Sequence, residues 1–69
     1  MELILKAIEN EGFEWLIRTD EEKGYFCHVH SKEYVLSNYE RGISCKVYGH
    51  DKLVILTGAF GMAKSGMSN

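Results

Sequence analysis

Proline is absent from this chain of 69 residues, cysteine occurs only twice, and no apolar run approaches the ~20 residues that a bilayer requires. Two cysteines are too few for the disulfide framework of a small secreted domain, so we expect a cytoplasmic protein with reduced thiols and no membrane-spanning segment. Because proline is missing, the turns must be built from Gly, Asn, Asp and Ser.

Signatures of catalysis are also missing. The segment GAFGMAKS, residues 58–65, nearly matches a phosphate-binding loop, but Ala63 stands where that pattern requires glycine. Cys27 and His28 are adjacent, and in a strand their side chains would point to opposite faces. A domain of this size seldom encloses a pocket of the usual volume. We therefore expect a non-enzymatic protein that acts through its surface.

The charges are distributed unevenly. Residues 1–22 carry seven acidic and two basic side chains, for a sum of −5, whereas residues 23–69 carry three acidic and six basic ones, for a sum of +3. If the two halves fold to separate faces, the molecule offers an acidic face to a basic partner. The other interpretation is an ordinary solvated surface.

The first half of the chain has clear periodicity. Residues 2–10, ELILKAIEN, place apolar side chains four apart, which predicts a helix. Residues 13–19 alternate between apolar and polar side chains, which predicts a half-buried strand. A polar turn that ends at Gly24 then leads to a second strand over residues 25–30.

The second half is less distinctive. Tyr34 and Val35 favour a strand over residues 33–37, although Ser31 could instead cap a short helix there. Strands are predicted at 43–48 and 53–57. The expected fold is α+β, with an N-terminal helix packed on an antiparallel sheet of about four strands. Residues 1–60 would form the single domain and 61–69 a flexible tail.

The predicted sheet has two unequal faces. The helix would cover one face, whose side chains are Phe13, Trp15, Ile17, Val29, Ile43 and Val47. The other face would still carry Leu16, Phe26, Tyr48, Val54 and Leu56. One helix covers only one face, so this surplus indicates a binding surface or a homodimer. Alternatively, the sheet curls on itself or the tail covers it.

The cysteines and histidines form a candidate zinc site. Two residues separate Cys27 from His30 and four separate Cys45 from His50, a spacing compatible with a structural Cys2His2 zinc centre. In a second arrangement, His28 and His30 form the metal pair, and His50 or a carboxylate completes the site. Against the first arrangement, strand periodicity separates Cys27 from His30, and a buried cysteine is an ordinary small apolar residue.

The order of segments suggests a family. An acidic helix, ELILKAIENEG, runs into the strand pair GFEWLIRTDEEKGYFCHVH and then SKEYVLS. In this respect the chain resembles small phage-encoded anti-CRISPR proteins. The resemblance implies a non-enzymatic inhibitor that docks on a host protein, a CRISPR effector nuclease, in the host cytoplasm and blocks nucleic-acid loading or cleavage. The residues expected to contact that partner are Glu14, Asp20, Glu21, Glu22, Phe26 and Tyr48.

The alternative is a zinc-stabilised adaptor or a small nucleic-acid-binding module. Aromatic and basic residues are interleaved, and aromatic side chains on a sheet can stack on bases. However, the net charge of −2 and the lack of a basic stripe disfavour direct nucleic-acid binding. The protein is expected to be a monomer or a homodimer.

Overall fold

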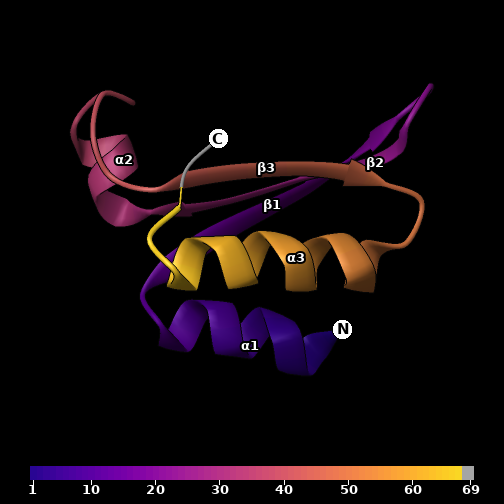
Figure 1. The fold of residues 1–69 in the computed structure, drawn as a ribbon, viewed down its shortest axis with the longest axis horizontal. Coiled ribbons are helices and arrows are strands. Elements are labelled where there is room, and N and C mark those ends of the chain that lie inside the picture. The colour runs from indigo at the N-terminus through magenta and orange to yellow at the C-terminus, as the bar shows by residue number, and fades with distance from the viewer. Residues whose placement is uncertain (68–69) are drawn as a thin grey trace.

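A computed structural model describes residues 1–67 of the chain (Figure 1). It contains three helices and three strands, and the first helix and the three strands agree with the predictions for residues 2–10, 13–19, 25–30 and 43–48. The elements are α1 (Glu2–Asn10), β1 (Phe13–Asp20), β2 (Gly24–Ser31), α2 (Lys32–Leu36), β3 (Ser44–Gly49) and α3 (Lys52–Lys64).

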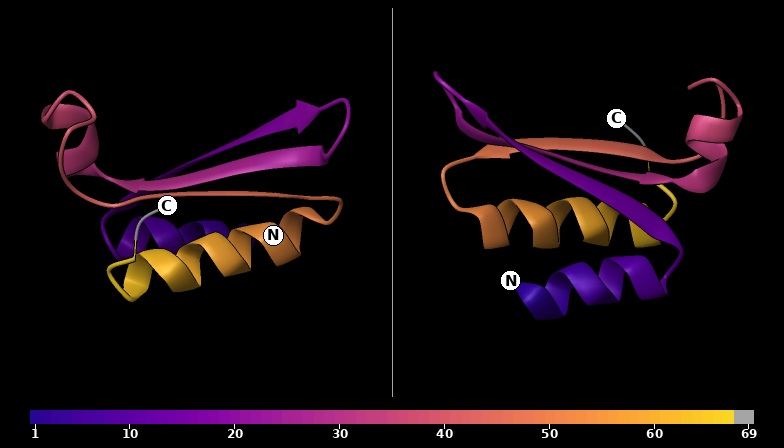
Figure 2. Two further views of the ribbon diagram at one scale, coloured as in Figure 1. Left: turned by 45° about the horizontal axis from the view of Figure 1, so that its top comes forward. Right: turned by 180° about the vertical axis from the view of Figure 1, so that it is seen from behind.

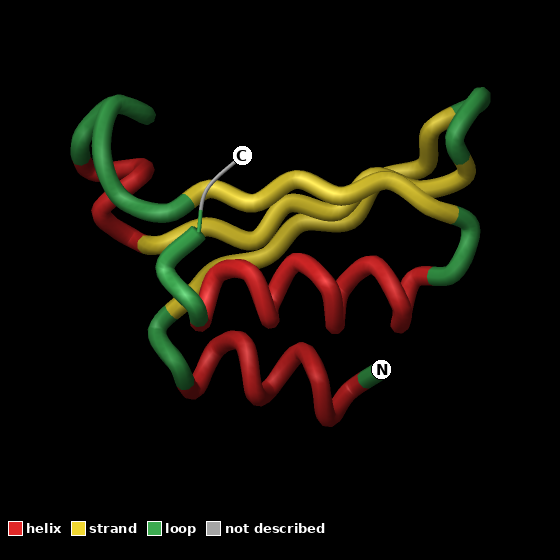
Figure 3. The backbone as a smooth tube through the Cα atoms, in the orientation of Figure 1, coloured by secondary structure: helices red, strands yellow, loops and turns green. Residues whose placement is uncertain are grey.

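The three strands form one antiparallel sheet in the order β1-β2-β3 (Figure 3). Its register places Ile17 opposite Cys27 and Cys27 opposite Val47. The next row along the sheet aligns Arg18, Phe26 and Tyr48. Because side chains alternate between the two faces of a strand, these two rows point in opposite directions.

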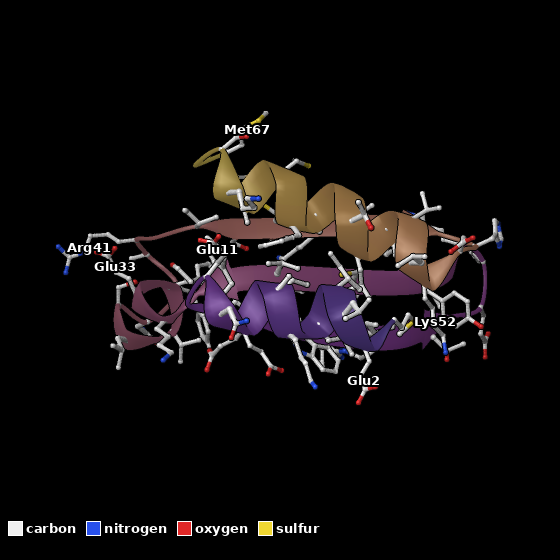
Figure 4. The ribbon with its side chains drawn as sticks, turned by 90° about the horizontal axis from the view of Figure 1, so that it is seen from below. Glu2, Glu11, Glu33, Arg41, Lys52 and Met67 are labelled. Atoms are coloured by element: carbon white, nitrogen blue, oxygen red, sulfur yellow. The ribbon has the colours of Figure 1, made fainter. Side chains whose placement is uncertain are left out.

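The long helices α1 and α3 lie side by side on one face of the sheet (Figures 1 and 4). α1 packs against β1, and α3 packs against β2 and β3. The rings of Phe13 and Phe60 meet edge to face, with centroids 6.4 Å apart. The core between helices and sheet contains Ile8, Cys27, Val29, Cys45, Ile55, Leu56, Ala59, Phe60 and Ala63. The fold is α+β, as the sequence predicts, but the described residues contain three strands rather than four.

The strand predicted at 33–37 is wrong, because residues 32–36 form α2. The alternative with Ser31 as the N-cap is the one observed, and its Oγ accepts a hydrogen bond from the backbone N–H of Tyr34 at 3.3 Å. Cap hydrogen bonds of this kind satisfy amide groups that otherwise have no partner in the first turn of a helix.

The strand predicted at 53–57 is also wrong, because these residues begin α3. Asp51 caps this helix, and its Oδ1 accepts hydrogen bonds from Leu53 N at 2.9 Å and from Val54 N at 3.2 Å. A short apolar run has no periodicity that separates a buried helix from a strand. Leu56 therefore lies in the core and not on the far face of the sheet.

The predicted tail starts too early. α3 continues through residues 61–64, and Ala63 is buried against the sheet. The phosphate-loop-like segment is largely helical for the same reason, so it forms no loop around a phosphate. Residues 68–69, the end of the predicted tail, lie outside the described part of the chain. In residues 1–67 no helix has the length and apolar character to cross a membrane.

Candidate binding surface

The sheet face opposite α1 and α3, here called the open face, is the candidate site. Its side chains are Glu14, Leu16 and Arg18 from β1, Phe26, His28 and His30 from β2, and Ser44, Lys46 and Tyr48 from β3. Leu16 is 38% exposed and Tyr48 is 47% exposed, so apolar groups on this face reach solvent. Figure 2 shows α2 standing at one end of the sheet and the β1–β2 hairpin extending at the other.

Aromatic rings cross this face in a continuous series, here called the ring row. It consists of Tyr48, Phe26, His28, His30, Tyr34 and Tyr39. The ring centroids of Phe26 and Tyr48 are 5.1 Å apart, and those of Phe26 and His28 are 6.2 Å apart. Tyr34, from α2, meets His28 at 5.5 Å and Tyr39 at 5.3 Å. Sheet register thus joins residues that are far apart in the sequence.

Two cations border the hairpin end of the ring row. Lys23 Nζ lies 4.3 Å from the ring centroid of Tyr48, and Arg18 Cζ lies 5.7 Å from that of Phe26. Both distances fall within the range at which a cation is attracted to an aromatic face. These contacts hold the two rings in an environment that combines apolar area with positive charge.

The middle of the ring row is occupied by a neutral histidine. His28 Nε2 lies 2.8 Å from Ser44 Oγ. Burial lowers the pKa of His28 from 6.5 to about 4, with further lowering by the charges of His30, Lys46 and Arg18. His28 is therefore uncharged near neutral pH and contributes a flat ring, while His30 Nδ1 lies 3.7 Å from Glu14 Oε1.

The predicted zinc ligands do not converge. Cys27 and Cys45 face the helices and are fully buried, whereas His28 and His30 lie on the open face. His30 pairs with the first residue of β3 and His50 follows its last, so about 20 Å separates them at ~3.3 Å per residue. Burial also raises the pKa of both thiols, that of Cys27 to about 11, whereas zinc binds thiolates.

The second arrangement is only partly assembled. The rings of His28 and His30 are adjacent, with centroids 4.7 Å apart, and the carboxylate of Glu14 lies 3.7 Å from His30 Nδ1, but His50 is remote from both rings. Residues 1–67 contain no group of three or more His, Cys, Asp or Glu side chains that could hold a metal ion.

The acidic residues predicted to contact a partner lie at two ends of the sheet. Glu14 lies near α2, while Asp20, Glu21 and Glu22 lie at the hairpin, about 20 Å along β1 at ~3.3 Å per residue. The Asp20 carboxylate is engaged in the turn, where Oδ1 accepts hydrogen bonds from Glu22 N at 3.0 Å and Lys23 N at 2.8 Å. These side chains do not form one acidic patch, whereas the predicted pair Phe26 and Tyr48 is adjacent.

The structure adds residues that the sequence did not identify as a site. Tyr34 and Tyr39 extend the ring row, and Tyr39 is 64% exposed. Beside them, α2 presents Leu36, which is 86% exposed, and Val35. In β1, Leu16 and Arg18 alternate with the helix-facing Trp15 and Ile17, and this alternation was the signal in the sequence for the open face. No local pattern predicts that α2 lies against the open face.

Comparison of the chain with protein-family models, with curated proteins and with solved structures gives no match.

Proposed function

We propose that this protein is a non-enzymatic protein-binding module that docks its open face on a partner. The observation that supports the proposal is the ring row, whose two ends, Tyr48 and Tyr39, are 47% and 64% exposed although the domain has a closed core on the other side of the sheet. Soluble monomers rarely leave contiguous apolar surface exposed without a use for it.

The composition of the surface favours a protein partner. Tyrosine, phenylalanine and arginine are enriched at the centres of protein interfaces, and Arg18, Phe26 and Tyr48 form one row across the sheet. The aliphatic side chains of Leu16 and Leu36 extend the same surface. Charges of both signs lie at its margins, including Glu14 and Lys46, as in the polar rim of an interface.

The resemblance to anti-CRISPR proteins makes a CRISPR effector nuclease the first partner to test. In this proposal the protein inhibits by occlusion, because a bound domain blocks nucleic-acid loading or cleavage. The contact centre is Phe26 and Tyr48, with Glu14 as the acidic group on the same face. Asp20 supports the hairpin turn that carries Lys23.

A cleavage assay with guide-loaded effector nucleases tests the proposal. Phe26→Ala should raise the concentration needed for half inhibition about 30-fold, since truncating a central aromatic anchor costs about 2 kcal/mol. Leu3→Ala is the matched control, because Leu3 is an exposed apolar residue of α1. Equal losses in both variants would contradict docking through the open face, and failure to inhibit any effector would remove this partner class.

A single-stranded nucleic acid is the second candidate ligand. Two pairs of a cation and an aromatic ring, Arg18 with Phe26 and Lys23 with Tyr48, favour this ligand. Rings of this kind stack on bases, and cations beside them bind phosphates. Fluorescence anisotropy with a labelled oligo-dT, measured at about 50 mM and about 200 mM salt, distinguishes a nucleic-acid ligand from a protein partner. Salt-dependent binding that Phe26→Ala abolishes, without nuclease inhibition, would replace the first proposal with the second.

A further inference from the structure

The outer edge of β1, here called the β1 edge, has no neighbouring strand within residues 1–67. β1 lies at one side of the sheet and pairs only with β2. The right view of Figure 2 shows the molecule from behind, where β1 runs in front of the other strands and no helix crosses it. α1 packs against β1 from the helix side of the sheet. An edge of this kind is a template for one further strand.

The hydrogen-bond pattern identifies the backbone groups at the β1 edge. Ser31 N donates to Ile43 O at 2.9 Å, so the backbone of Ser31 points toward β3. Because this direction alternates along an antiparallel strand, the even-numbered residues of β2 point toward β1. The even-numbered residues of β1 are their partners and bond to β2. The outward N–H and C=O groups of β1 therefore belong to Phe13, Trp15, Ile17 and Thr19.

The sequence of β1 does not protect its edge against pairing. Natural edge strands are often short, bulged or interrupted by lysine or proline. β1 has 8 residues, FEWLIRTD, with neither lysine nor proline, and its register with β2 runs without a bulge. β3, at the other side of the sheet, has 6 residues and includes Lys46. The β1 edge is therefore the one suited to a further strand.

The side chains of β1 on the open face are complementary to a second copy of the same strand. If two copies pair antiparallel about Leu16, Glu14 lies opposite Arg18 of the other copy, and the two leucines meet at the twofold axis. All three side chains are exposed. Within residues 1–67, Arg18 lies over the ring of Phe26 and forms no ion pair with a carboxylate.

The backbone and the charges select the same register. Pairing about Leu16 sets Trp15 opposite Ile17 of the other copy, so the outward backbone groups face one another as hydrogen-bonded pairs. Pairing about Glu14 or Arg18 would set like charges opposite each other, which is destabilising. Pairing about Trp15 or Ile17 would leave Glu14 without an opposite charge. A single register thus satisfies the hydrogen bonds and the charges together.

We infer that this protein forms a symmetric homodimer through antiparallel pairing of two β1 edges, centred on Leu16. Glu14 of each copy forms an ion pair with Arg18 of the other. The two sheets join into one continuous sheet, and both open faces lie on the same side of it. This inference goes beyond the proposed function and does not depend on it, because the dimer uses the edge of the sheet whereas docking uses its face.

Sedimentation equilibrium of the intact protein tests for the dimer. The mass should rise with concentration from the monomer value of 7.9 kDa toward twice that value, because association follows mass action. A monomer mass at every concentration up to about 1 mM would overturn the inference, since such an affinity is too weak for a specific dimer.

Charge reversal tests the register. Glu14→Arg sets two cations opposite each other and Arg18→Glu sets two carboxylates opposite each other. Each variant alone should therefore raise the dimer dissociation constant at least about tenfold. The double variant Glu14→Arg/Arg18→Glu should dimerise as the parent does. An equimolar mixture of the two single variants should also dimerise, because each supplies the charge that the other requires.

Matched controls carry the same charge changes away from the β1 edge. Glu40→Arg and Arg41→Glu change exposed residues in the loop after α2 and should leave the dissociation constant unchanged. Amide hydrogen exchange, measured by NMR, then locates the pairing. The amides of Trp15 and Ile17 should become protected as the concentration rises, whereas the amide of Leu16, which bonds to β2, should be protected at every concentration.

Several results would overturn the inference. These are single variants that dimerise as well as the parent, a mixture or a double variant that stays monomeric, or protection that appears along β3 instead of β1. Phe26→Ala should leave the dimer intact, so the two proposals fail separately. Loss of nuclease inhibition in Phe26→Ala with a monomeric parent would refute the dimer alone. A dimeric parent whose inhibition is unaffected by Phe26→Ala would refute the docking alone.

Discussion

Gly42 offers a sharp test of how the open face is assembled, because it controls the position of α2. Its φ is 91°, and a Cβ added there would lie 2.5 Å from Ser31 Oγ and 2.7 Å from Tyr34 N. Ser31 Oγ accepts hydrogen bonds from both Tyr34 N and Ile43 N, at 3.3 Å and 3.0 Å. Gly42→Ala should therefore disrupt the cap of α2 and displace Tyr34 from the ring row.

The size of the effect follows from comparison with Gly12. Gly12 has a φ of 86°, but a Cβ there would meet nothing within 4 Å. Gly12→Ala should reduce the free energy of unfolding by about 1 kcal/mol. Placing alanine in the left-handed region destabilises the folded state, and part of this cost is offset because alanine lowers the conformational entropy of the unfolded chain. Gly42→Ala adds a lost cap of about 1 kcal/mol and at least about 1 kcal/mol of overpacking, for about 3 kcal/mol in total.

Urea unfolding measures both variants. With a slope near 1 kcal/mol per molar, the midpoint should fall by about 1 M for Gly12→Ala and by about 3 M for Gly42→Ala. Equal midpoints, within about 0.5 M of each other, would refute the view that contact with Ser31 and Tyr34 makes Gly42 irreplaceable. An intact Tyr34 ring environment in the NMR spectrum of Gly42→Ala would refute the link to the open face.

Further predictions concern α3, His28 and the thiols. Gly58 and Gly61 lie within α3 and face open space, so Gly58→Ala and Gly61→Ala should each raise the free energy of unfolding by about 1 kcal/mol in urea titrations; a decrease would show that these positions are covered. The lowered pKa of His28 means that the unfolded chain binds its proton more readily. This contribution to stability is complete above pH 6.5 and is lost as the pH falls toward about 4. His28→Asn should hence lose less stability than the parent between about pH 7 and about pH 4.5, and identical losses would contradict the assignment. Because Cys27 and Cys45 are buried, both should react with a disulfide reagent only upon unfolding. Native mass spectrometry should give the same mass for the parent with and without a chelator, and a zinc adduct abolished by Cys45→Ser would restore the metal hypothesis.

The N-terminal half of the fold is predictable because its signals are local. The apolar stripe of residues 2–10 defines α1, and the alternation of Trp15 and Ile17 with Leu16 and Arg18 defines both faces of β1. A polar turn ending at Gly24 then fixes the hairpin. Each of these features depends on neighbours within a few residues, so the sequence carries them directly.

The C-terminal half is only partly predictable in this way, because the strand predicted at 43–48 is confirmed as β3 whereas the helix α3 was missed. Residues 53–57 are apolar on all sides and suit a strand as well as a buried helix, and the distinction depends on the Asp51 cap and on packing across the sheet. The positions of the predicted zinc ligands were not predictable for a related reason. Sequence spacing brought Cys27 and His30 together, whereas the extended backbone of β2 turned them to opposite faces.

By itself, the sequence determined that this is a small α+β domain, because composition and short-range periodicity suffice for that. Of the apolar residues predicted on the far face of the sheet, Leu16, Phe26 and Tyr48 lie there, whereas Val54 and Leu56 belong to α3. It also identified Phe26 and Tyr48 as candidate contact residues, and the structure places them side by side on the open face. Only the tertiary structure decided that Tyr34 and Tyr39 extend the ring row. These contacts join α2, its following loop and β2, and the packing of α2 against the sheet is encoded by no local pattern.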